Sequence, residues 1–542
     1  MGSPSSTDTH SSASREGQLE HAHRIARPAI FLAGLGGLAL ALTMGWQMSI
    51  AAYFGATPEL DAYWLALALP KAMVDSVHLG ILTLLFIIVF SLSGEKTDGE
   101  RFALGSSLIN MVLLSTAVVI PVLVLEAEWV IRRMGPGLSA ELWADGARQL
   151  RLLGLLLIPT SLTGAMAGVL HAKQRFLPFA TARIVGLAAQ IGFVALFASR
   201  MGVDVLIWAM MTGAVITLVG CTPAFRATGF RYSPTIALGG GRYRIVFQIF
   251  FALIAFAVLD RLNQISDRYF ASTLAAGSIS ALEYGWRFEI PISHILSMSI
   301  ALPSLAMMAA HAVDHDVLLL RRTLAISLRL LAMLVVPLIG FLFVLREPLT
   351  RLWFQRGVFS PDAALLVSSL IPGLSVMFLM RAIGTITVYS LMAVRRLGAL
   401  LIVLAIEVAL NTVLNAVLVG PLQLRGVVIA TAIAMVCGNA AMVGLLLHAL
   451  DRWPARALLA RVRKPIAVSG LTVLLLSACV HLVPALGETV WGVGASGLVL
   501  VVTQFVLARA SGLIELGVKN GRRRVRLGLH DWSDPASDEM PL

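Results

Sequence analysis

Charged side chains are scarce in this sequence. Only 13% of the 542 residues are Asp, Glu, Lys or Arg, whereas 58% are hydrophobic. An ordinary soluble domain carries about 25% charged residues, so the composition excludes a soluble enzyme. Apolar runs recur from end to end and give a mean hydropathy of +0.85. This is more apolar surface than soluble cores can bury, so the chain is predicted to be a polytopic membrane protein.

Cysteine is also nearly absent, and no nucleotide motif is present. The three cysteines, Cys221, Cys437 and Cys479, each lie in an apolar stretch without CxxC spacing or a nearby histidine. This pattern predicts neither a disulfide framework nor a metal site. The glycine run 239–241 lacks the Lys-Ser/Thr that completes a phosphate-binding loop. No cofactor is expected, and the expected energy source is a Na⁺ or H⁺ gradient, the membrane potential or the substrate gradient.

The chain is basic, with 42 Lys and Arg against 30 Asp and Glu and a formal net charge of +12. In a soluble protein this balance would suggest nucleic acid as a partner. Membrane proteins, however, keep Lys and Arg in short cytoplasmic loops, and a cytoplasmic N-terminus places most of these residues inside. The strongest contributors lie at 452–464 and 522–526. We therefore expect no nucleic acid partner, and we expect both termini to be cytoplasmic.

Apolar runs of ~20 residues predict an all-α fold with about fourteen transmembrane helices. A faint repeat supports two six-helix lobes, because Tyr53-Phe54 and Pro70 are echoed six helices later by Tyr269-Phe270 and Pro291. A central cavity is expected between the lobes, and two further helices follow them. The predicted order is a disordered cytoplasmic tail at 1–26, an N-terminal lobe at 27–224, an inter-lobe loop at 225–244, a C-terminal lobe at 245–450, the last two spans at 465–509 and a basic cytoplasmic tail at 510–542.

Composition also gives predictions for two segments outside the spans. The segment 345–362 alternates Arg346, Arg351 and Arg356 with leucine and aromatic residues. It is predicted to be amphipathic and to lie at the membrane interface. Residues 521–542 are polar and are predicted to be disordered.

Ionisable residues inside the predicted spans are the most informative feature. Each costs roughly 2.5 to 3.5 kcal/mol to place near mid-bilayer on insertion scales, so each should face protein or water. Their spacing places them on shared helix faces. A water-filled cavity between the two lobes would accommodate all these faces together. The residues are Lys71, Asp75 and His78; Asp260, Arg261, Gln264, Asp267 and Arg268; Glu283, Arg287, Glu289 and His294; Arg381; and Glu407, Asn411 and Asn415.

Simpler interpretations stay open for some of these faces. Lys71 and Asp75 are as consistent with an intrahelical ion pair as with substrate contact. For Glu407, Asn411 and Asn415 an interhelical hydrogen-bond seam is favoured. The cationic residues suit an anionic headgroup such as a diphosphate, because Arg binds phosphate oxygens in bidentate fashion. The carboxylates could instead bind Na⁺ or protons.

Several short motifs follow one another between about residues 30 and 510. They are Phe54-Gly55-Ala56 with Leu60-Asp61-Ala62-Tyr63-Trp64 and Leu69-Pro70; Asp267-Arg268-Tyr269-Phe270-Ala271-Ser272 with Gly277-Ser278-Ile279-Ser280-Ala281-Leu282, Tyr284, Arg287 and Pro291; Phe354-Gln355-Arg356-Gly357-Val358-Phe359; and Asn415 with Gly420-Pro421 and Gly426. Together they resemble the motifs of the MurJ/MviN lipid flippase family. The resemblance implies the multidrug/oligosaccharidyl-lipid/polysaccharide exporter superfamily, with a cavity of alternating access. In the family that cavity moves an undecaprenyl-diphosphate-linked saccharide, typically lipid II, to the outer leaflet.

The sequence also departs from the family pattern. The stretch 40–46, which matches the part of the first helix where the family carries arginines, has none, and Val74 and Asp75 replace a basic pair expected after Pro70. Asp61 and Arg287 do match. Either the remaining cations substitute for the missing ones, or the carried lipid differs from lipid II. These remaining cations are Lys71, Arg261, Arg268, Arg287 and Arg381.

The predicted function is a flippase for a polyprenyl-diphosphate-linked saccharide, either lipid II or a related cell-envelope or exopolysaccharide precursor. Such a transporter is not an enzyme, since no covalent chemistry is needed. Arg287, Arg268 and Lys71 would hold phosphate. Asp61, Asp75 and Asp267 would pair with these cations in the empty state. The predicted cavity residues are Asp61, Lys71, Asp75, Arg261, Asp267, Arg268, Glu283, Arg287 and Arg381.

Two alternatives are a cation-coupled multidrug or metabolite antiporter of the same superfamily and a non-transporting scaffold. The antiporter would use Asp75, Asp267 or Glu283 as its ion site. Lys71 and Arg287, one helical turn from two of these carboxylates, count against it. The expected partners are an undecaprenyl-diphosphate-linked glycan and membrane lipids. The expected location is the bacterial cytoplasmic (inner) membrane, where the protein is expected to be a monomer.

Overall fold

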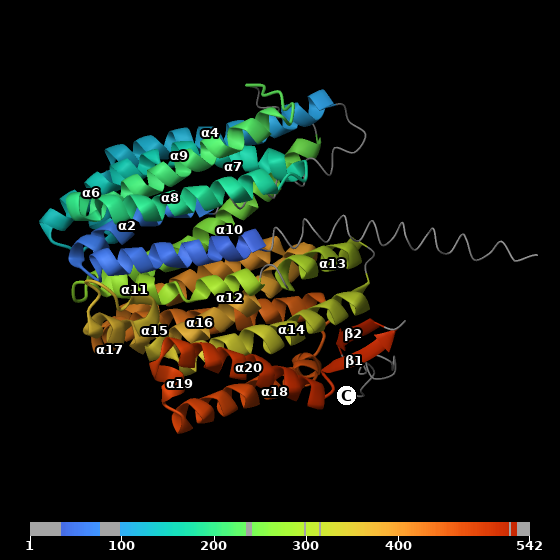
Figure 1. The fold of residues 1–542 in the computed structure, drawn as a ribbon. Coiled ribbons are helices and arrows are strands. Elements are labelled where there is room, and N and C mark those ends of the chain that lie inside the picture. Colours follow the sequence, from blue (N-terminus) through green and yellow to red (C-terminus); the bar gives the residue numbers. More distant parts are fainter. Residues whose placement is uncertain are drawn as a thin grey trace, which may run out of the picture. The chain divides into compact units, whose positions relative to one another are not determined.

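The computed structural model describes residues 34–75, 98–234, 241–296, 300–313, 316–519 and 522–527 of the chain. Almost all of this described part is helical (Figure 1). The chain divides into two compact units that interleave in sequence. Unit 1 is built from Met1–Phe54, Ala66–Ile131 and Ala140–Ile254, and unit 2 from Gly55–Leu65, Arg132–Ser139 and Ala255–Leu542.

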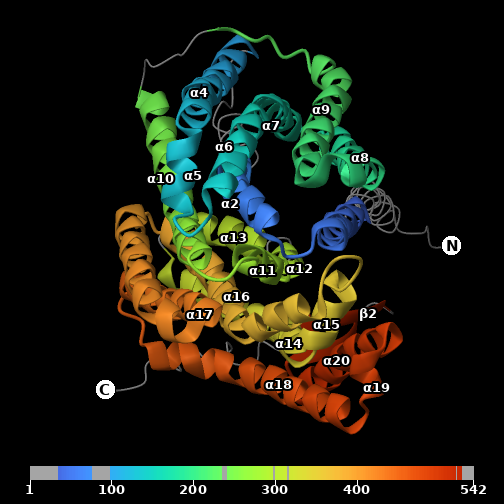
Figure 2. The same ribbon diagram turned by 90° about the vertical axis from the view of Figure 1, so that its left-hand side faces the viewer.

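Unit 1 is a bundle of apolar helices in which α8 packs along α9, and α9 also contacts α7 (Figure 2). Glycines permit the closest approach, because a Cβ at Gly186 of α8 would lie 2.7 Å from the carbonyl oxygen of Gly213 on α9. Small residues at such crossings are typical of membrane helix pairs. The helices in chain order are Gly34–Phe54, the later part of α2 (Pro58–Ala72), α4 (Asp98–Leu125), the first part of α5 (Ala127–Met134), α6 (Ala140–Leu155), α7 (Leu157–Ala172), α8 (Leu177–Met201), the 3₁₀ turn η2 (Gly202–Asp204), α9 (Val205–Arg226) and the start of α10 (Gly241–Ser272).

Unit 2 contains the rest of α10 and the helices that follow it. In this unit α14 packs against α16 and α18, α16 packs against α17, and α18 packs against α20. Interhelical hydrogen bonds tie these apolar helices together, for example from Ser469 Oγ to the carbonyl oxygen of Ala332 at 2.7 Å. The helices are α11 (Ser278–Trp286), α12 (Glu289–Leu296), α13 (Leu302–Val313), α14 (Val317–Val344), α15 (Arg346–Phe354), α16 (Pro361–Ala393), α17 (Leu397–Ala449), α18 (Ala455–Leu482), α19 (Ala485–Glu488) and α20 (Val490–Ala510).

The described residues contain nine continuous helical stretches that are long and apolar enough to cross a membrane. Two of them, Leu177–Arg226 with 50 residues and Leu397–Ala449 with 53 residues, are far longer than one crossing requires. Each contains a break with positive φ, at Gly202 (φ 56°) and at Gln423 (φ 54°). The all-α polytopic fold is therefore confirmed. The total of about fourteen spans stays a prediction, as does the division into two six-helix lobes.

Most of the segment 345–362 forms the short helix α15 (Arg346–Phe354), which is amphipathic as predicted. Leu349, Thr350 and Phe354 are buried, whereas Arg346 and Arg351 are exposed. Ser360 then begins α16, because its hydroxyl accepts a hydrogen bond from Ala363 N–H at 3.1 Å and Pro361 occupies the first helical position.

The prediction that residues 521–542 are disordered is wrong for residues 522–527. Strand β2 (Arg522–Leu527) pairs antiparallel with β1 (Ile514–Lys519), with Ile514 opposite Leu527. The sequence signal was the Asn520-Gly521 dipeptide between two short segments, a strong signal for a tight hairpin turn.

Candidate functional site

Asp61 lies in the first turn of α2 and fastens that turn to the start of α11. Its Oδ2 accepts a hydrogen bond from Gly277 N–H at 2.7 Å, and its Oδ1 accepts from Ser280 N–H at 2.7 Å and Ser280 Oγ at 2.6 Å. The N-terminus of a helix presents unpaired N–H groups and a partial positive charge, which a buried carboxylate satisfies. A second bond between the same segments joins Tyr284 Oη to the Gly55 carbonyl oxygen at 2.7 Å.

Glu283 of α11 holds two guanidinium groups at once. Arg268 donates to Glu283 Oε1 from Nε at 2.9 Å and also from Nη2, and Arg287 Nη2 donates to Oε2 at 2.8 Å. The side chains are 11% exposed for each Arg and 8% for Glu283. Two cations and one anion leave this group with an excess positive charge. Arg287 also stacks over the Trp64 ring at 5.0 Å, a cation–π contact.

Arg287 keeps an unused donor. Its Nε is buried and has no hydrogen-bond partner in the described part of the chain. A buried donor without a partner is costly and needs an explanation. An anion that displaces Glu283 would find this donor and the excess charge together.

A second group surrounds Asp260 on α10. Arg381 of α16 approaches it, with Nη1 at 3.3 Å from Asp260 Oδ1, and Arg261 Nε lies 4.0 Å from Oδ2. Arg261 also donates from Nη1 to Gln264 Oε1 at 3.2 Å. These side chains are half-buried, and Arg381 lies over the Trp286 ring at 5.5 Å. The contact between oppositely charged residues on α10 and α16 explains how these charges are tolerated inside apolar helices.

A third group surrounds Asp267, one helical turn beyond Asn263 on α10. Its Oδ1 accepts hydrogen bonds from Asn411 Nδ2 at 3.0 Å, Asn415 Nδ2 at 3.0 Å and Thr431 Oγ1 at 2.8 Å, all of them on α17. All four side chains are buried. Asn263 makes a related bond to Glu407 Oε1 at 3.3 Å. The interhelical hydrogen-bond seam predicted for Glu407, Asn411 and Asn415 is therefore what α10 and α17 form.

Lys71 and Asp75 lie in unit 1, where they form an ion pair of 2.8 Å at i, i+4 spacing. Their side chains are 38% and 34% exposed. The pair spans the end of α2 at Ala72 and the π-helical turn that follows it. His78, predicted on the same face, lies outside the described residues, and the side chain of His294 is likewise not described.

The structure thus divides the predicted site residues into separate groups and changes some of their expected partners. Lys71 pairs with Asp75 as expected. Asp61 instead binds N–H and hydroxyl donors at a helix start, and Asp267 binds amide and hydroxyl donors. The carboxylate that pairs with Arg268 and Arg287 is Glu283, where Asp61 and Asp267 were expected. Sequence reasoning missed Ser280, Thr431 and Trp64 as partners; Ser280 and Trp64 stand inside the quoted motifs, whereas Thr431 gave no signal.

The described residues contain no group of three or more His, Cys, Asp or Glu side chains arranged to hold a metal ion. The Asp267 group is a different kind of candidate cation site, because a carboxylate, two amides and a hydroxyl converge there. Asn415 Oδ1 has no hydrogen-bond partner in the described part of the chain. Amide and carboxylate oxygens are suitable ligands for a hard cation.

Long apolar helices with ionisable groups placed inside them define a multi-pass membrane protein of the transporter type. A family model described as "Lipid II flippase MurJ" matches residues 50–502, most of the chain. The chain therefore belongs to the MurJ family.

Relatives with this description have modest sequence identity to this chain. "Lipid II flippase MurJ" of Burkholderia cenocepacia is 24% identical over 357 residues, covering 63% of this chain and 68% of the relative. "Probable lipid II flippase MurJ" of Aquifex aeolicus is 25% identical over 352 residues, covering 64% of this chain and 68% of the relative. The protein of the same description from Buchnera aphidicola is 23% identical and covers 60% of this chain. The chain spans 64% of the length of that last relative.

Solved structures confirm the fold. "Lipid II flippase MurJ, inward closed conformation" superposes with a TM-score of 0.72 at 19% identity, covering 89% of this chain and 98% of that structure. An "inward-facing conformation of a multidrug resistance MATE family transporter of the MOP superfamily" superposes with a TM-score of 0.57 at 16% identity. The superposition covers 78% of this chain and 94% of that structure. The second likeness shows that a MATE family transporter shares this fold.

Proposed function

We propose that this protein is a flippase that carries a polyprenyl-diphosphate-linked saccharide from the inner to the outer leaflet by alternating access. Lipid II or a related cell-envelope precursor is the substrate, in keeping with the names of the relatives. The observation that supports it best is the group of Arg268, Arg287 and Glu283, which carries excess positive charge and an unused buried donor.

A diphosphate is the headgroup chemistry that fits this group. Arg268 and Arg287 share a single carboxylate, and a diphosphate carries more negative charge and more acceptor oxygens than Glu283 supplies. Guanidinium groups bind phosphate oxygens in a bidentate fashion. The substrate would therefore displace Glu283 from the two arginines, and Glu283 would restore the empty state after release. No covalent step is needed.

The Asp267 group is our candidate for a coupling cation. Three donors on α17 converge on Asp267 Oδ1. The side-chain amides of Asn411 and Asn415 can rotate, and reversed amides would present their oxygens to a cation. Coupling to Na⁺, to protons or to the membrane potential would then supply the energy for transport.

A cation-coupled multidrug antiporter is the second candidate function. The fold shared with a MATE transporter is the observation in favour of the antiporter, although one fold can serve several functions. Pairing of Glu283 with two arginines counts against it, since an antiporter ion site needs a carboxylate free to exchange its cation. Broad drug resistance on overexpression, without a defect in envelope lipids on depletion, would favour the antiporter.

The proposed setting is the bacterial cytoplasmic membrane, with both termini in the cytoplasm. We propose that the chain acts as a monomer on a lipid substrate, without a nucleic acid partner. The basic segments at 452–464 and 522–526 support this orientation through the positive-inside rule.

The direct test measures leaflet accessibility of polyprenyl-linked glycans in cells depleted of the protein. We expect the precursor to accumulate in the inner leaflet and to return to the outer leaflet when the wild-type chain is expressed. Arg287→Gln should fail to restore it, whereas Arg456→Gln, at an exposed arginine of α18, should restore it. Normal outward movement of every polyprenyl-linked glycan in depleted cells would refute the proposal.

A further inference from the structure

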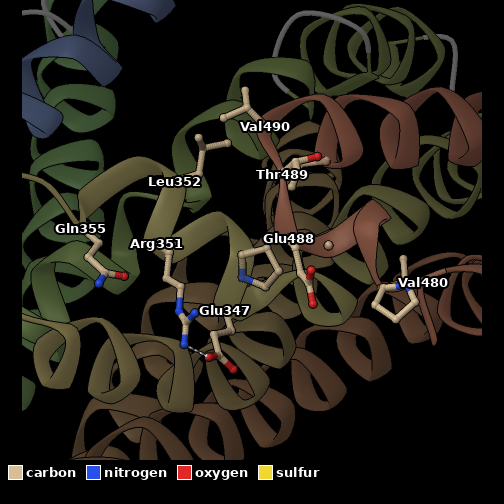
Figure 3. Close-up of a pocket in the computed structure, with 12 residues that line it drawn as sticks. Glu347, Arg351, Leu352, Gln355, Val480, Glu488, Thr489 and Val490 are labelled. Atoms are coloured by element: carbon tan, nitrogen blue, oxygen red, sulfur yellow. Dashed lines mark hydrogen bonds and ion pairs between the residues drawn. The ribbon is translucent and has the colours of Figure 1, made fainter. Parts of the chain in front are cut away.

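A cavity of about 610 Å³ opens at one end of unit 2 (Figure 3). Its walls come from α15 and from the turn that contains α19. Helix α15 connects the end of α14 at Val344 to α16, and α19 connects the end of α18 at Leu482 to α20. Since α14, α16, α18 and α20 are membrane-spanning stretches, their ends lie near the lipid headgroups. The cavity therefore lies at headgroup depth.

The charged lining of this cavity has both signs. Arg351 and Glu347 of α15 form an ion pair of 2.5 Å with both side chains exposed. Glu488 of α19 adds a second carboxylate, and Figure 3 shows it directed toward the same space as the pair. The charged lining residues are thus two carboxylates and one guanidinium, with a net negative charge. A ligand with a cationic group and an adjacent anionic group matches this arrangement.

Apolar side chains also line the cavity, and exposed apolar residues stand next to them in the sequence. Val490 lines the cavity, and the neighbouring Trp491 is 88% exposed at the first turn of α20. Leu482, at the end of α18, is 79% exposed. Exposed tryptophan at the end of a spanning helix is typical of the membrane interface. A ligand bound between Arg351 and Glu488 therefore has exposed apolar side chains nearby for its hydrocarbon chains.

We propose that this cavity binds the headgroup of a zwitterionic phospholipid with a primary ammonium, of the phosphoethanolamine class. The ammonium donates hydrogen bonds to Glu488, and the phosphate accepts them from Arg351. The acyl chains lie along Val490, Trp491 and Leu482. The site shares no residue with the Glu283, Asp260 and Asp267 groups, so it does not depend on the proposed transport function.

The chemistry distinguishes this headgroup from those of other common lipids. A primary ammonium donates hydrogen bonds to a carboxylate, whereas the quaternary ammonium of phosphatidylcholine has no N–H group to donate. Phosphatidylglycerol has no cation and would bring a second negative charge to a negatively charged lining. We therefore expect phosphatidylethanolamine to bind in preference to both.

The test is a lipid titration of the purified full-length protein in detergent, followed by native mass spectrometry. We expect phosphatidylethanolamine to bind about tenfold more tightly than either other lipid, the effect of one charge-assisted contact. Glu488→Gln and Arg351→Gln should each remove this preference. Glu141→Gln, at an exposed acidic residue of α6, is the matched control and should keep it.

Equal binding of the three lipids would overturn the proposal, and so would unchanged preference in both Glu488→Gln and Arg351→Gln. Soluble glycerophosphoethanolamine separates the two sources of this headgroup chemistry. If it binds as tightly as the diacyl lipid, the assignment to a membrane lipid is wrong. Both substituted side chains are exposed, so the variants are expected to fold.

Discussion

Asp61 accepts two hydrogen bonds from one distant residue, Ser280. The backbone N–H of Ser280 lies 2.7 Å and its hydroxyl 2.6 Å from Asp61 Oδ1. The contact joins the start of α2 to the start of α11, across more than two hundred residues of sequence. Asp61 is buried, so these bonds are shielded from water. Its role in this conformation is to hold two helix starts together, in place of pairing with a phosphate-binding cation.

Substitution of Asp61 should therefore lower stability. Asp61→Asn removes the negative charge at the positive end of α11 and replaces one acceptor by a donor that faces N–H groups. We expect a loss of about 1–3 kcal/mol, typical of a charged buried hydrogen bond. The measurement is the thermal unfolding midpoint of the purified protein. Glu59→Gln, in the same helical turn but exposed, is the control; an equal shift in both variants would contradict the assignment.

Gly277 should tolerate no side chain. Its φ is 86°, and a Cβ there would lie 2.5 Å from the Ala56 carbonyl oxygen. Gly277→Ala should cost about 1 kcal/mol or more through backbone strain alone, and the clash adds to this. Gly398→Ala provides the contrast, because open space surrounds Gly398 in α17 and alanine favours helix there by up to ~1 kcal/mol. Urea or thermal unfolding should shift in opposite directions, and parallel shifts would refute this explanation.

Glu283→Gln should affect the empty protein and the occupied protein differently. Without the carboxylate, Arg268 and Arg287 repel each other in a poorly hydrated place, at a cost of ~3–5 kcal/mol. A diphosphate would then bind without displacing a competitor. We expect a lower unfolding temperature without ligand and a larger rise on adding a short polyprenyl diphosphate. The control is Asp145→Asn, which breaks the exposed pair of Asp145 and Arg148. In this variant the unfolding temperature without ligand and its rise with ligand should both match the wild-type values within the error of measurement.

Thr431→Val tests the Asp267 group with little change in shape. The substitution removes one of the three donors to Asp267 Oδ1 and should cost about 1–2 kcal/mol. If the group binds Na⁺, the rise in unfolding temperature on replacing choline by Na⁺ should shrink with it. Thr412→Val, on the same helix but exposed, should leave the rise intact. A rise that is the same in the wild-type protein and both variants would place the cation elsewhere.

Contacts within one helix could be predicted from the sequence. Lys71 with Asp75 and Glu283 with Arg287 follow directly from i, i+4 spacing, because helix geometry places such pairs on one face. Long apolar runs gave the helical membrane fold for the same reason, since lipid forces the backbone to satisfy its own hydrogen bonds. The amphipathic helix α15 could also be predicted, because arginine alternates with apolar residues along it.

Contacts between distant segments could not be predicted. Asp267 meets Asn411 across 144 residues, and nothing in the local pattern of α10 specifies amides as its partners. Thr431 looked like an ordinary residue of an apolar helix. The family resemblance predicts Asp61 among the cavity carboxylates, whereas the partners of Asp61 are set by the start of α11 at Gly277, a contact that only the tertiary fold creates.

The central claim is that Arg268 and Arg287 bind a lipid diphosphate in competition with Glu283. Equilibrium binding of a polyprenyl diphosphate to the purified full-length protein tests it most directly, with the matching polyprenyl monophosphate and the control Arg456→Gln measured in parallel. We predict that the diphosphate binds more tightly than the monophosphate and that the double variant Arg268→Gln/Arg287→Gln weakens diphosphate binding by about a hundredfold, tenfold for each charge-assisted contact. Unchanged diphosphate affinity in the double variant would contradict the account.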